Sequence, residues 1–352
     1  MWHCGYGRLE VAERVWQGRA GAWQRPFAAQ AGVSGRGCSR RLRRLAGDPA
    51  PEEPFGRAAA RLDEHHGVTL APSTLRLLTL RHARALAGRQ LARAPVRTLP
   101  AAGAAALVVE ADGTLLPQVE FAPGPGDRRK LRRVAYREVR LLAAQAAGQA
   151  HAHYAVSFGD PDEVGGQWQH AARQAGWAAS TCIHALGEGA ERIAGLARTG
   201  FGVPGRYLPD LCHVGGYLAA AAPAGEADCL SRQKAALCQG RAAAVIAAPV
   251  ARREPAATPE PAAPVRAAHR YFANRSDRLD YPAALARGLP IGSGLIESGH
   301  KHVLQKRLKL PGAAWLRTNS AAIAHARVVR ARVVRANGGW SAYWASLLHA
   351  QN

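Results

Sequence analysis

Three acidic residues lie at positions where carboxylates can take part in metal-dependent chemistry: Asp112, Glu188 and Glu297. Asp112 ends a hydrophobic run, Glu188 follows a second apolar run and lies between two glycines, and Glu297 stands at the start of an expected helix. Carboxylates at strand ends, far apart in sequence, can converge on a pair of divalent cations. Two such ions about 3.5–4 Å apart activate a water and stabilise the leaving oxygen of a phosphodiester. These three residues are thus candidates to hold Mg²⁺ or Mn²⁺, as two ions, although strands often end in Asp or Glu without a catalytic role.

The elements that must position these carboxylates alternate between strand and helix over residues 101–212. The segment Ala106–Phe121 predicts a strand and its neighbour, meeting around Asp112 and Gly113, and Glu163–Ala175 predicts a helix. The segment 134–146 is expected to be a strand or the start of a helix, and further strands are expected near residues 151–159, 180–187 and 206–212. Such alternation is typical of an α/β core. Residues 213–247 read as helical, residues 249–264 as a Pro/Ala/Glu-rich linker, and the block from 267 onwards as helical and basic.

Residues 1–100 are rich in arginine and mostly helical in pattern. Two segments there, Pro26–Leu45 and Arg61–Leu80, each run from a helix through Gly-Val-Ser or Gly-Val-Thr to a second helix. Gly32 and Gly67 suit the turns because glycine accepts a positive φ. This pattern predicts an all-α region with two helix-turn-helix units, whose second helix enters the major groove of DNA. An ordinary helical hairpin with a solvated basic face is the alternative.

Two details complete this interpretation. Ser34 in the first unit and Ser73 in the second are the expected N-caps of the following helices. The side chains expected to contact phosphates or guanine edges are arginines of the first unit: Arg36, Arg40, Arg41, Arg43 and Arg44. A second basic run follows Glu297 and also suits contact with the DNA backbone: Lys301, Gln305, Lys306, Arg307 and Lys309.

The overall charge points to the same class of partner. The chain has 352 residues with 47 Lys and Arg against 25 Asp and Glu, a formal net charge of +22. Such an excess favours a polyanionic partner, and nucleic acid is the commonest. The six cysteines form no Cys-x-x-Cys pair and are expected to be free thiols of a cytosolic protein. No signal peptide and no membrane span are expected, since no apolar run reaches about 18 residues.

Several longer motifs resemble the DDE transposases of the ISKra family of bacterial insertion sequences. They are LVVEADGTLLP from Leu107, LPDLCHVGGYLAAAAP from Leu208, and the stretch from His269 that contains IGSGLIES and QKRLK. The resemblance extends in outline over nearly the whole chain. It implies an RNase H-like core in which Asp112, Glu188 and Glu297 form the DDE triad. It also implies double-stranded DNA with terminal inverted repeats as substrate, no organic cofactor, a nucleoid-associated location and a homo-oligomer on DNA.

The resemblance further divides the chain into a helix-turn-helix region (1–100), the first part of the core (101–212), a helical insertion with its linker (213–268) and the C-terminal part of the core (269–352). Three more residues match family positions: Glu138, Asp210 and His213. For Glu138 a surface ion pair is an equal alternative, and for Asp210 and His213 a structural hydrogen bond is favoured over a role at a DNA end. Trp315, Trp340 and Trp344 are expected to pack rather than stack on bases.

The chain departs from the family at Glu188, where the family usually has Asp. The extra methylene moves the carboxylate outward by about 1.5 Å, and Mg²⁺ demands near-ideal octahedral geometry. Three hypotheses therefore stay open: an active transposase, a DNA-binding relic with a damaged metal site, and a metal-dependent nuclease that cuts without joining.

Overall fold

The computed structural model describes residues 1–19, 21–33, 37–93, 95–202, 206–223, 228–248, 254–255, 257–259 and 262–334. The chain divides into two compact units, and the division falls inside two long strands. Unit 1 contains residues 1–93, 116–137 and 302–352, and unit 2 contains residues 94–115 and 138–301. The segment boundaries expected at residues 100, 212 and 268 stay predictions.

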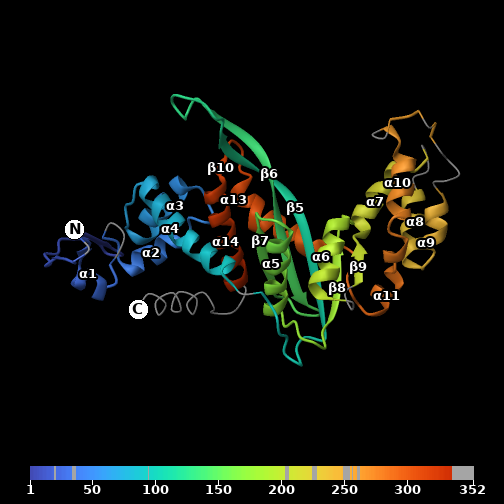
Figure 1. Ribbon diagram of the computed structural model, residues 1–352, viewed down its shortest axis with the longest axis horizontal. Helices are drawn as coiled ribbons and strands as arrows, with labels where there is room; N and C mark the ends of the chain where they lie inside the picture. The colour runs from blue at the N-terminus through green and yellow to red at the C-terminus, as the bar shows by residue number, and fades with distance from the viewer. Residues whose placement is uncertain are drawn as a thin grey trace. The chain divides into compact units, whose positions relative to one another are not determined.

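Unit 2 is a mixed α/β structure built on the main sheet (Figure 1). The strands lie in the order β7-β6-β5-β8-β9, and their bounds are β5 (Ala106–Phe121), β6 (Arg132–Ala146), β7 (Ala152–Ser157), β8 (Cys182–Gly187) and β9 (Arg206–Pro209). β5, β8 and β9 run parallel, whereas β6 and β7 are antiparallel. The helices of this unit are α5 (Pro161–Gln174), α6 (Glu191–Phe201), α7 (Leu211–Ala220), α8 (Cys229–Cys238), α9 (Ala242–Ala247), α10 (Pro264–Ala273), α11 (Tyr281–Ala286) and α12 (Gly294–Gly299), with a 3₁₀ turn at Ser276–Arg278.

The sheet of unit 2 is covered on both faces because its strands alternate between two hydrophobic cores. Leu107, Val109 and Ala111 of β5 point into a core shared with α5 and α6. Val108, between them, points into the opposite core, which is built with α7, α10 and α11. Side chains on a strand alternate between faces with a period of two. Glu110 and Asp112 therefore share the face of Val108, the face that α12 covers.

Helix α5 illustrates how local sequence starts an element of this core. Asp160 caps it by accepting a hydrogen bond from the backbone N–H of Glu163 (2.9 Å), and Pro161 occupies its first turn. Trp168 lies on its buried face, fully enclosed, with the indole N–H donating to the carbonyl of Ala143 on β6 (3.1 Å). The helix predicted here is confirmed. The sequence reveals it because both its cap and its apolar spacing lie within one segment.

One expectation for the core is wrong. The segment Ala106–Phe121 forms a single continuous strand, β5, rather than two strands that meet at Asp112. β8 pairs with β5 only over Ala106–Glu110, and further along, β5 pairs in parallel with β10 (Trp315–Leu316). New partners beyond Asp112 satisfy the backbone, so the strand continues.

Unit 1 is mainly helical, with α1 (Pro26–Gln30), α2 (Arg40–Gly47), α3 (Phe55–His66), α4 (Pro72–Leu91), α13 (Lys306–Leu308) and α14 (Arg317–Val334). A π-helical turn at His300–Gln305 precedes α13. The core of α2, α3 and α4 includes Leu62 and Leu75, both buried. Arg327 of α14 is also buried; it pairs with Glu52 (2.8 Å) and donates to the carbonyl of Pro51 (3.0 Å).

The N-terminal region is not all-α as expected. Two short antiparallel pairs precede α1: β1 (Trp2–Cys4) with β2 (Gly7–Leu9), and β3 (Trp16–Gln17) with β4 (Trp23–Gln24). These strands are two or three residues long. They are too short to carry a visible alternation of apolar and polar residues, so the sequence pattern missed them.

Two successive helix pairs, α1 with α2 and α3 with α4, occupy the segments expected to form helix-turn-helix units. The turns have the predicted glycine conformation, with φ of +65° at Gly32 and +59° at Gly67. The caps differ from those expected. Ser39 caps α2 by accepting from the N–H of Leu42 (3.2 Å), and Ser73 lies inside α4, which begins at Pro72. Ser34 lies outside the described residues.

The six cysteines are free, as predicted. Among the described residues, every helix falls short of the length or the apolar character that crossing a membrane needs.

Candidate active site

Asp112 and Glu188 lie level with one another at the point where β8 leaves the sheet. The parallel register pairs Glu110 with Leu186, and both candidate carboxylates follow two residues later. Two residues is one strand period, so Asp112 lies on the same face of β5 as Glu110, while Glu188 follows directly after the end of β8. Asp112 also accepts a hydrogen bond at Oδ1 from the N–H of Gly113 (2.7 Å). The fold thus brings together two carboxylates that are far apart in the chain.

Two tyrosines and an arginine hold the loop that carries Glu188 through hydrogen bonds to its backbone. The hydroxyl of Tyr271 donates to the carbonyl of Glu188 (3.1 Å), and the N–H of Gly189 donates to the hydroxyl of Tyr207 (2.8 Å). Arg275 donates from Nε to the carbonyl of Gly189 (2.7 Å). Gly189 has φ +91°, and a Cβ there would lie 2.3 Å from the Tyr271 hydroxyl. Only glycine fits this close approach.

Burial and the charges of nearby groups determine the electrostatic environment of Glu188. Burial raises the pKa of the Glu188 carboxyl above its ordinary value, and the negative charge of Asp112 raises it further. His213 and His300 act in the opposite direction, and Glu138 adds to the repulsion. Crowded carboxylates of this kind are stabilised by a bound cation.

His300, the residue after α12, contacts Asp112 directly. Its Nε2 lies 3.2 Å from Oδ2 of Asp112, and its side chain is 4% exposed. The approach lacks the alignment of a hydrogen bond, and neither ring nitrogen has a hydrogen-bond partner among the described residues. The sequence analysis did not foresee this contact. The available signal was its spacing of three residues from Glu297, which puts both side chains on one face of a helix.

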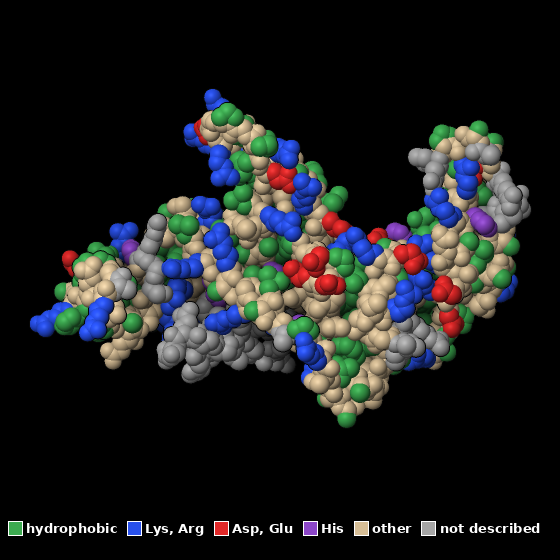
Figure 2. Space-filling model, in the orientation of Figure 1, with side chains coloured by type: hydrophobic (Ala, Val, Ile, Leu, Met, Phe, Trp, Pro, Cys, Tyr) green, Lys and Arg blue, Asp and Glu red, His purple; other side chains and the backbone are tan. Residues whose placement is uncertain are grey.

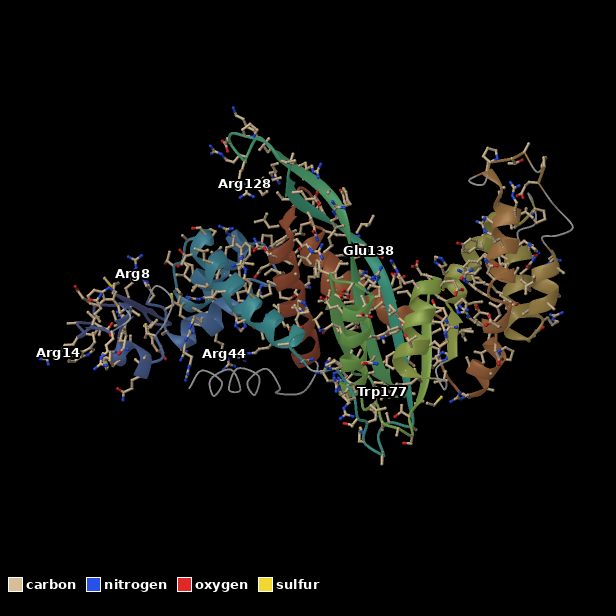
Figure 3. All side chains as sticks on the ribbon, in the orientation of Figure 1. Arg8, Arg14, Arg44, Arg128, Glu138 and Trp177 are labelled. Atoms are coloured by element: carbon tan, nitrogen blue, oxygen red, sulfur yellow. The ribbon has the colours of Figure 1, made fainter. Side chains whose placement is uncertain are left out.

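Glu138 on β6 borders the same site. Its Oε1 lies 2.5 Å from the position that a Cβ on Gly113 would take, so the glycine leaves room for this carboxylate. Glu138 also pairs with Arg140 (2.7 Å) and with Arg192 (3.4 Å). The ion pairing weighed for Glu138 is therefore present, and the residue also lies beside the candidate centre. Figure 3 labels it on the sheet.

Glu297 lies on α12, which a buried carboxyl group attaches to the sheet. Glu110 is 1% exposed and accepts a hydrogen bond at Oε2 from the N–H of Ile296 (2.7 Å). Burial raises the pKa of Glu110 to about 7, and the nearby charges of Asp210 and Glu297 add to this. Glu297 itself is exposed. Its position at the start of a helix is confirmed; its convergence with Asp112 and Glu188 on one centre stays a prediction.

The donor atoms suit a hard divalent cation. Asp112, Glu188 and Glu297 offer only carboxylate oxygens, the ligands that Mg²⁺ prefers, and the first two repel one another until a cation neutralises them. Within the part of the chain that the structure describes, no three His, Cys, Asp or Glu side chains are already grouped as metal ligands. The residues fit the ion in chemistry, and metal binding would have to draw them together.

Asp210 and His213 have different surroundings. Asp210 is buried, caps α7 by accepting from the N–H of Cys212 (2.8 Å), and accepts from the hydroxyl of Ser293 (2.6 Å). This is the structural hydrogen bonding favoured for it. His213 is exposed, with its ring against Tyr217 and Tyr271 at 5.8 and 6.4 Å between centroids.

The basic residues after Glu297 separate into exposed and buried members. Lys301, Gln305, Lys306 and Lys309 are exposed. Arg307 is 3% exposed, and its guanidinium lies 4.9 Å from the ring centre of Phe55 and 4.7 Å from that of Trp315. Packing between two aromatic rings occupies the guanidinium of Arg307, and its expected contact with DNA stays a prediction. Trp315 packs, as predicted; Trp340 and Trp344 lie outside the described residues.

The arginines expected at the DNA surface of the first helix pair also differ from one another. Arg40 and Arg41 are exposed, and Arg41 donates to the hydroxyl of Tyr6 (2.8 Å). Arg43 is half-buried and donates to the carbonyl of Gly32 (3.1 Å). Arg44 is partly exposed and is labelled in Figure 3. Arg36 lies outside the described residues.

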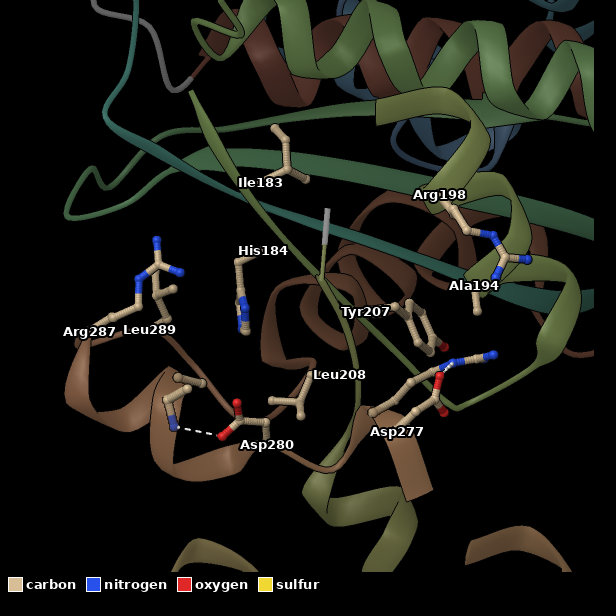
Figure 4. A pocket seen from close by; sticks show the side chains of 13 residues that line it. Ile183, His184, Ala194, Arg198, Tyr207, Leu208, Asp277, Asp280, Arg287 and Leu289 are labelled. Atoms are coloured by element: carbon tan, nitrogen blue, oxygen red, sulfur yellow. Dashed lines mark hydrogen bonds and ion pairs between the residues drawn. The ribbon is translucent and has the colours of Figure 1, made fainter. Parts of the chain in front are cut away.

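Unit 2 also contains a cavity of about 370 Å³ that none of the candidate carboxylates lines (Figure 4). Its wall includes His184, Tyr207 and the arginines Arg198, Arg278 and Arg287. His184 lies 2.7 Å through Nε2 from the carbonyl of Pro290, and burial lowers its pKa. Arg278 pairs with Asp277 of the same wall (3.4 Å) and with Glu191, which lies outside it (2.9 Å).

Comparison with known proteins adds no family. A scan against models of known protein families finds no match to this chain, and a search of curated proteins also finds none.

Proposed function

We propose that this protein is a DDE-type transposase of the ISKra family, which cuts and joins DNA at the ends of an insertion sequence. The observation that carries the proposal is the pairing of Asp112 and Glu188. Asp112 lies on β5, Glu188 follows the neighbouring parallel strand β8 at the same level of the register, and the charge of Asp112 adds to burial in raising the pKa of Glu188. Among carboxylate pairs, such crowding at a strand mouth is typical of a metal-dependent catalytic centre.

The strand order supports an RNase H-like core. Counted along the chain from β5, the strands lie in the order third, second, first, fourth, fifth, with the fourth parallel to the first. In this fold the first candidate carboxylate comes from the central strand and the second follows its parallel neighbour. The two helix pairs near the N-terminus and the net charge of +22 support DNA as the substrate.

In this proposal the residues of the site have separate roles. Asp112, Glu188 and Glu297 would hold the metal ions, which supply an activated water and stabilise the leaving oxygen. His300 contacts Asp112 and would fix the orientation of its carboxylate. Arg192, which is exposed and paired with Glu138 (3.4 Å), would neutralise a phosphate of the DNA strand.

Glu188 gives a specific reason to keep the relic as a second candidate. Its carboxylate is about one methylene, roughly 1.5 Å, further from the backbone than that of Asp, and the extra rotatable bond makes it less preorganised. DNA binding should be near normal, since the loop that carries Glu188 is held by backbone contacts that do not involve its carboxylate. Cleavage should be weak, and stronger with Mn²⁺ than with Mg²⁺.

The test is cleavage and strand transfer on a duplex that carries the terminal inverted repeats found in the DNA flanking the gene. Asp112→Ala and Glu297→Ala should abolish activity, and Glu188→Asp should raise it. Asp162→Ala is the matched control, because Asp162 is an exposed carboxylate in the first turn of α5. Cutting without joining would identify a nuclease. Lower activity in Glu188→Asp would show that the protein has adapted to Glu, and binding without cutting in every variant would identify a relic.

A further inference from the structure

The hairpin formed by the distal halves of β5 and β6 is a basic ribbon that the active-site proposal does not use. It runs from Leu116 to Arg137 within unit 1. The N–H of Ala122 donates to the carbonyl of Leu131 (2.9 Å) and closes the ribbon, and residues 123–130 of its tip are all exposed. At its base, Gln118 is 2% exposed and pairs with Trp315 of β10. The ribbon is thus anchored at one end and solvated at the other (Figure 1).

The hairpin carries an unusual excess of positive charge. Six of its side chains are Arg or Lys and two are carboxylates. Glu120 pairs with Arg133 (3.3 Å) and Arg137 (2.6 Å), and Asp127 pairs with Arg129 (2.8 Å). Figure 2 shows Lys and Arg side chains gathered along this ribbon and at its tip.

Three further cations of the hairpin have no carboxylate partner in the part of the chain that the structure describes. Arg128, labelled in Figure 3, stacks over the ring of Phe121 at 4.5 Å, which leaves its edge open to solvent. For Lys130 and Arg132 the described residues supply no ion pair at all. Like charges held close on a two-stranded ribbon repel one another. A polyanion lying along the ribbon would remove that repulsion.

One side of β6 adds a surface suited to contact with a nucleic acid. Arg132, Val134 and Tyr136 alternate along the strand and therefore share a face. Val134 is 48% exposed and Tyr136 is 66% exposed, so this face is uncovered. A cation, an apolar side chain and a phenol in a row can contact phosphate, sugar and base edge in turn. The density of positive charge favours DNA over an apolar protein partner.

We propose that the hairpin Leu116–Arg137 is a DNA-binding arm that lies along duplex DNA, with its cations on the phosphates. This inference rests on the proposed function for the identity of the polyanion. A two-stranded β-ribbon has the width to enter the major groove. The arm would therefore add a contact surface on the duplex besides those expected from the N-terminal helix pairs and the basic run after Glu297.

The test is the salt dependence of binding by the full-length protein to a random-sequence DNA duplex. The arm variant is Arg128→Ala/Lys130→Ala/Arg132→Ala. Each lost phosphate contact lowers the slope of log K against log salt by about 0.9, so three lost contacts lower it by up to about 2.7. The matched control, Arg173→Ala/Arg198→Ala/Arg287→Ala, removes the same charge from exposed positions of unit 2 and should change the slope much less. Tyr136→Ala should weaken binding without changing the slope.

The outcomes separate this inference from the proposed function. An arm variant with the slope of the unaltered protein would overturn the inference, whether or not the protein cleaves DNA. Loss of slope in a protein that never cleaves would support the arm while the proposed function fails. A change in sedimentation behaviour with the slope intact would identify the ribbon as a protein interface and overturn the proposal. Because the mutated side chains are exposed, circular dichroism should show all variants folded.

Discussion

Acid should destabilise unit 1 through His325, a histidine buried on α14. Its side chain is 2% exposed, and Nδ1 lies 2.6 Å from Oε1 of Gln90 on α4, so the neutral ring donates from Nδ1. Burial, with a smaller contribution from the charge of Arg93, lowers the pKa of His325 from 6.5 to about 4. The folded protein thus binds this proton less readily than the unfolded chain does.

The sign and size of the effect follow from linkage. Between pH 6.5 and 4 the unfolded state carries more protons at this position, so the free energy of unfolding falls as the pH falls. Above pH 6.5 the ring is neutral in both states, so His325 causes no loss in the free energy of unfolding there. At pH 5 the loss is about 2 kcal/mol, and below pH 4 it approaches about 3 kcal/mol, at about 1.36 kcal/mol for each pH unit of difference. His82 on α4, with its pKa also lowered to about 4 by burial, should add a loss of its own.

The measurement is urea unfolding of the full chain at pH 7.5 and pH 5, followed through the transition that includes α4 and α14. His325→Gln should be less stable than the unaltered protein at pH 7.5, since it leaves space in a packed contact. It should nevertheless lose about 2 kcal/mol less on going to pH 5. His66→Gln, which alters an exposed histidine of α3, is the control and should follow the unaltered protein. An equal acid loss in His325→Gln and the unaltered protein would refute the reasoning.

Two other predictions follow from packing. Trp168→Ala should lower the free energy of unfolding of unit 2 by about 3–5 kcal/mol, because it leaves a large cavity beneath the sheet; urea unfolding measures this, and a loss below 1 kcal/mol would contradict the packing described around it. Arg307→Ala should lower the melting temperature through loss of its two cation–π contacts and leave the salt dependence of DNA binding unchanged. Lys306→Ala, at the exposed neighbour, should lower the salt dependence of DNA binding and leave the melting temperature unchanged. If Arg307→Ala instead lowered the salt dependence and Lys306→Ala did not, Arg307 would be a DNA contact.

Several features of the protein could be read from the sequence because short segments determine them. The helix α5 has its cap and its apolar spacing within one stretch of chain, and Gly32 and Gly67 adopt the positive φ that their turns require. The excess of basic residues and the candidate carboxylates Asp112 and Glu188 were likewise visible as residue types beside hydrophobic runs. Such features depend on neighbours a few residues away, so periodicity and turn chemistry reveal them.

The tertiary structure alone decided the features that depend on distant partners. β5 continues past Asp112 because β10, some two hundred residues later, pairs with its distal half. Arg307 is buried because Phe55 and Trp315 enclose it. His300 contacts Asp112, and Glu110 holds α12, only because the sheet and that helix pack together. The sequence specifies which groups are present, but whether a charge meets solvent, a ring or another charge depends on long-range packing, which no local pattern records.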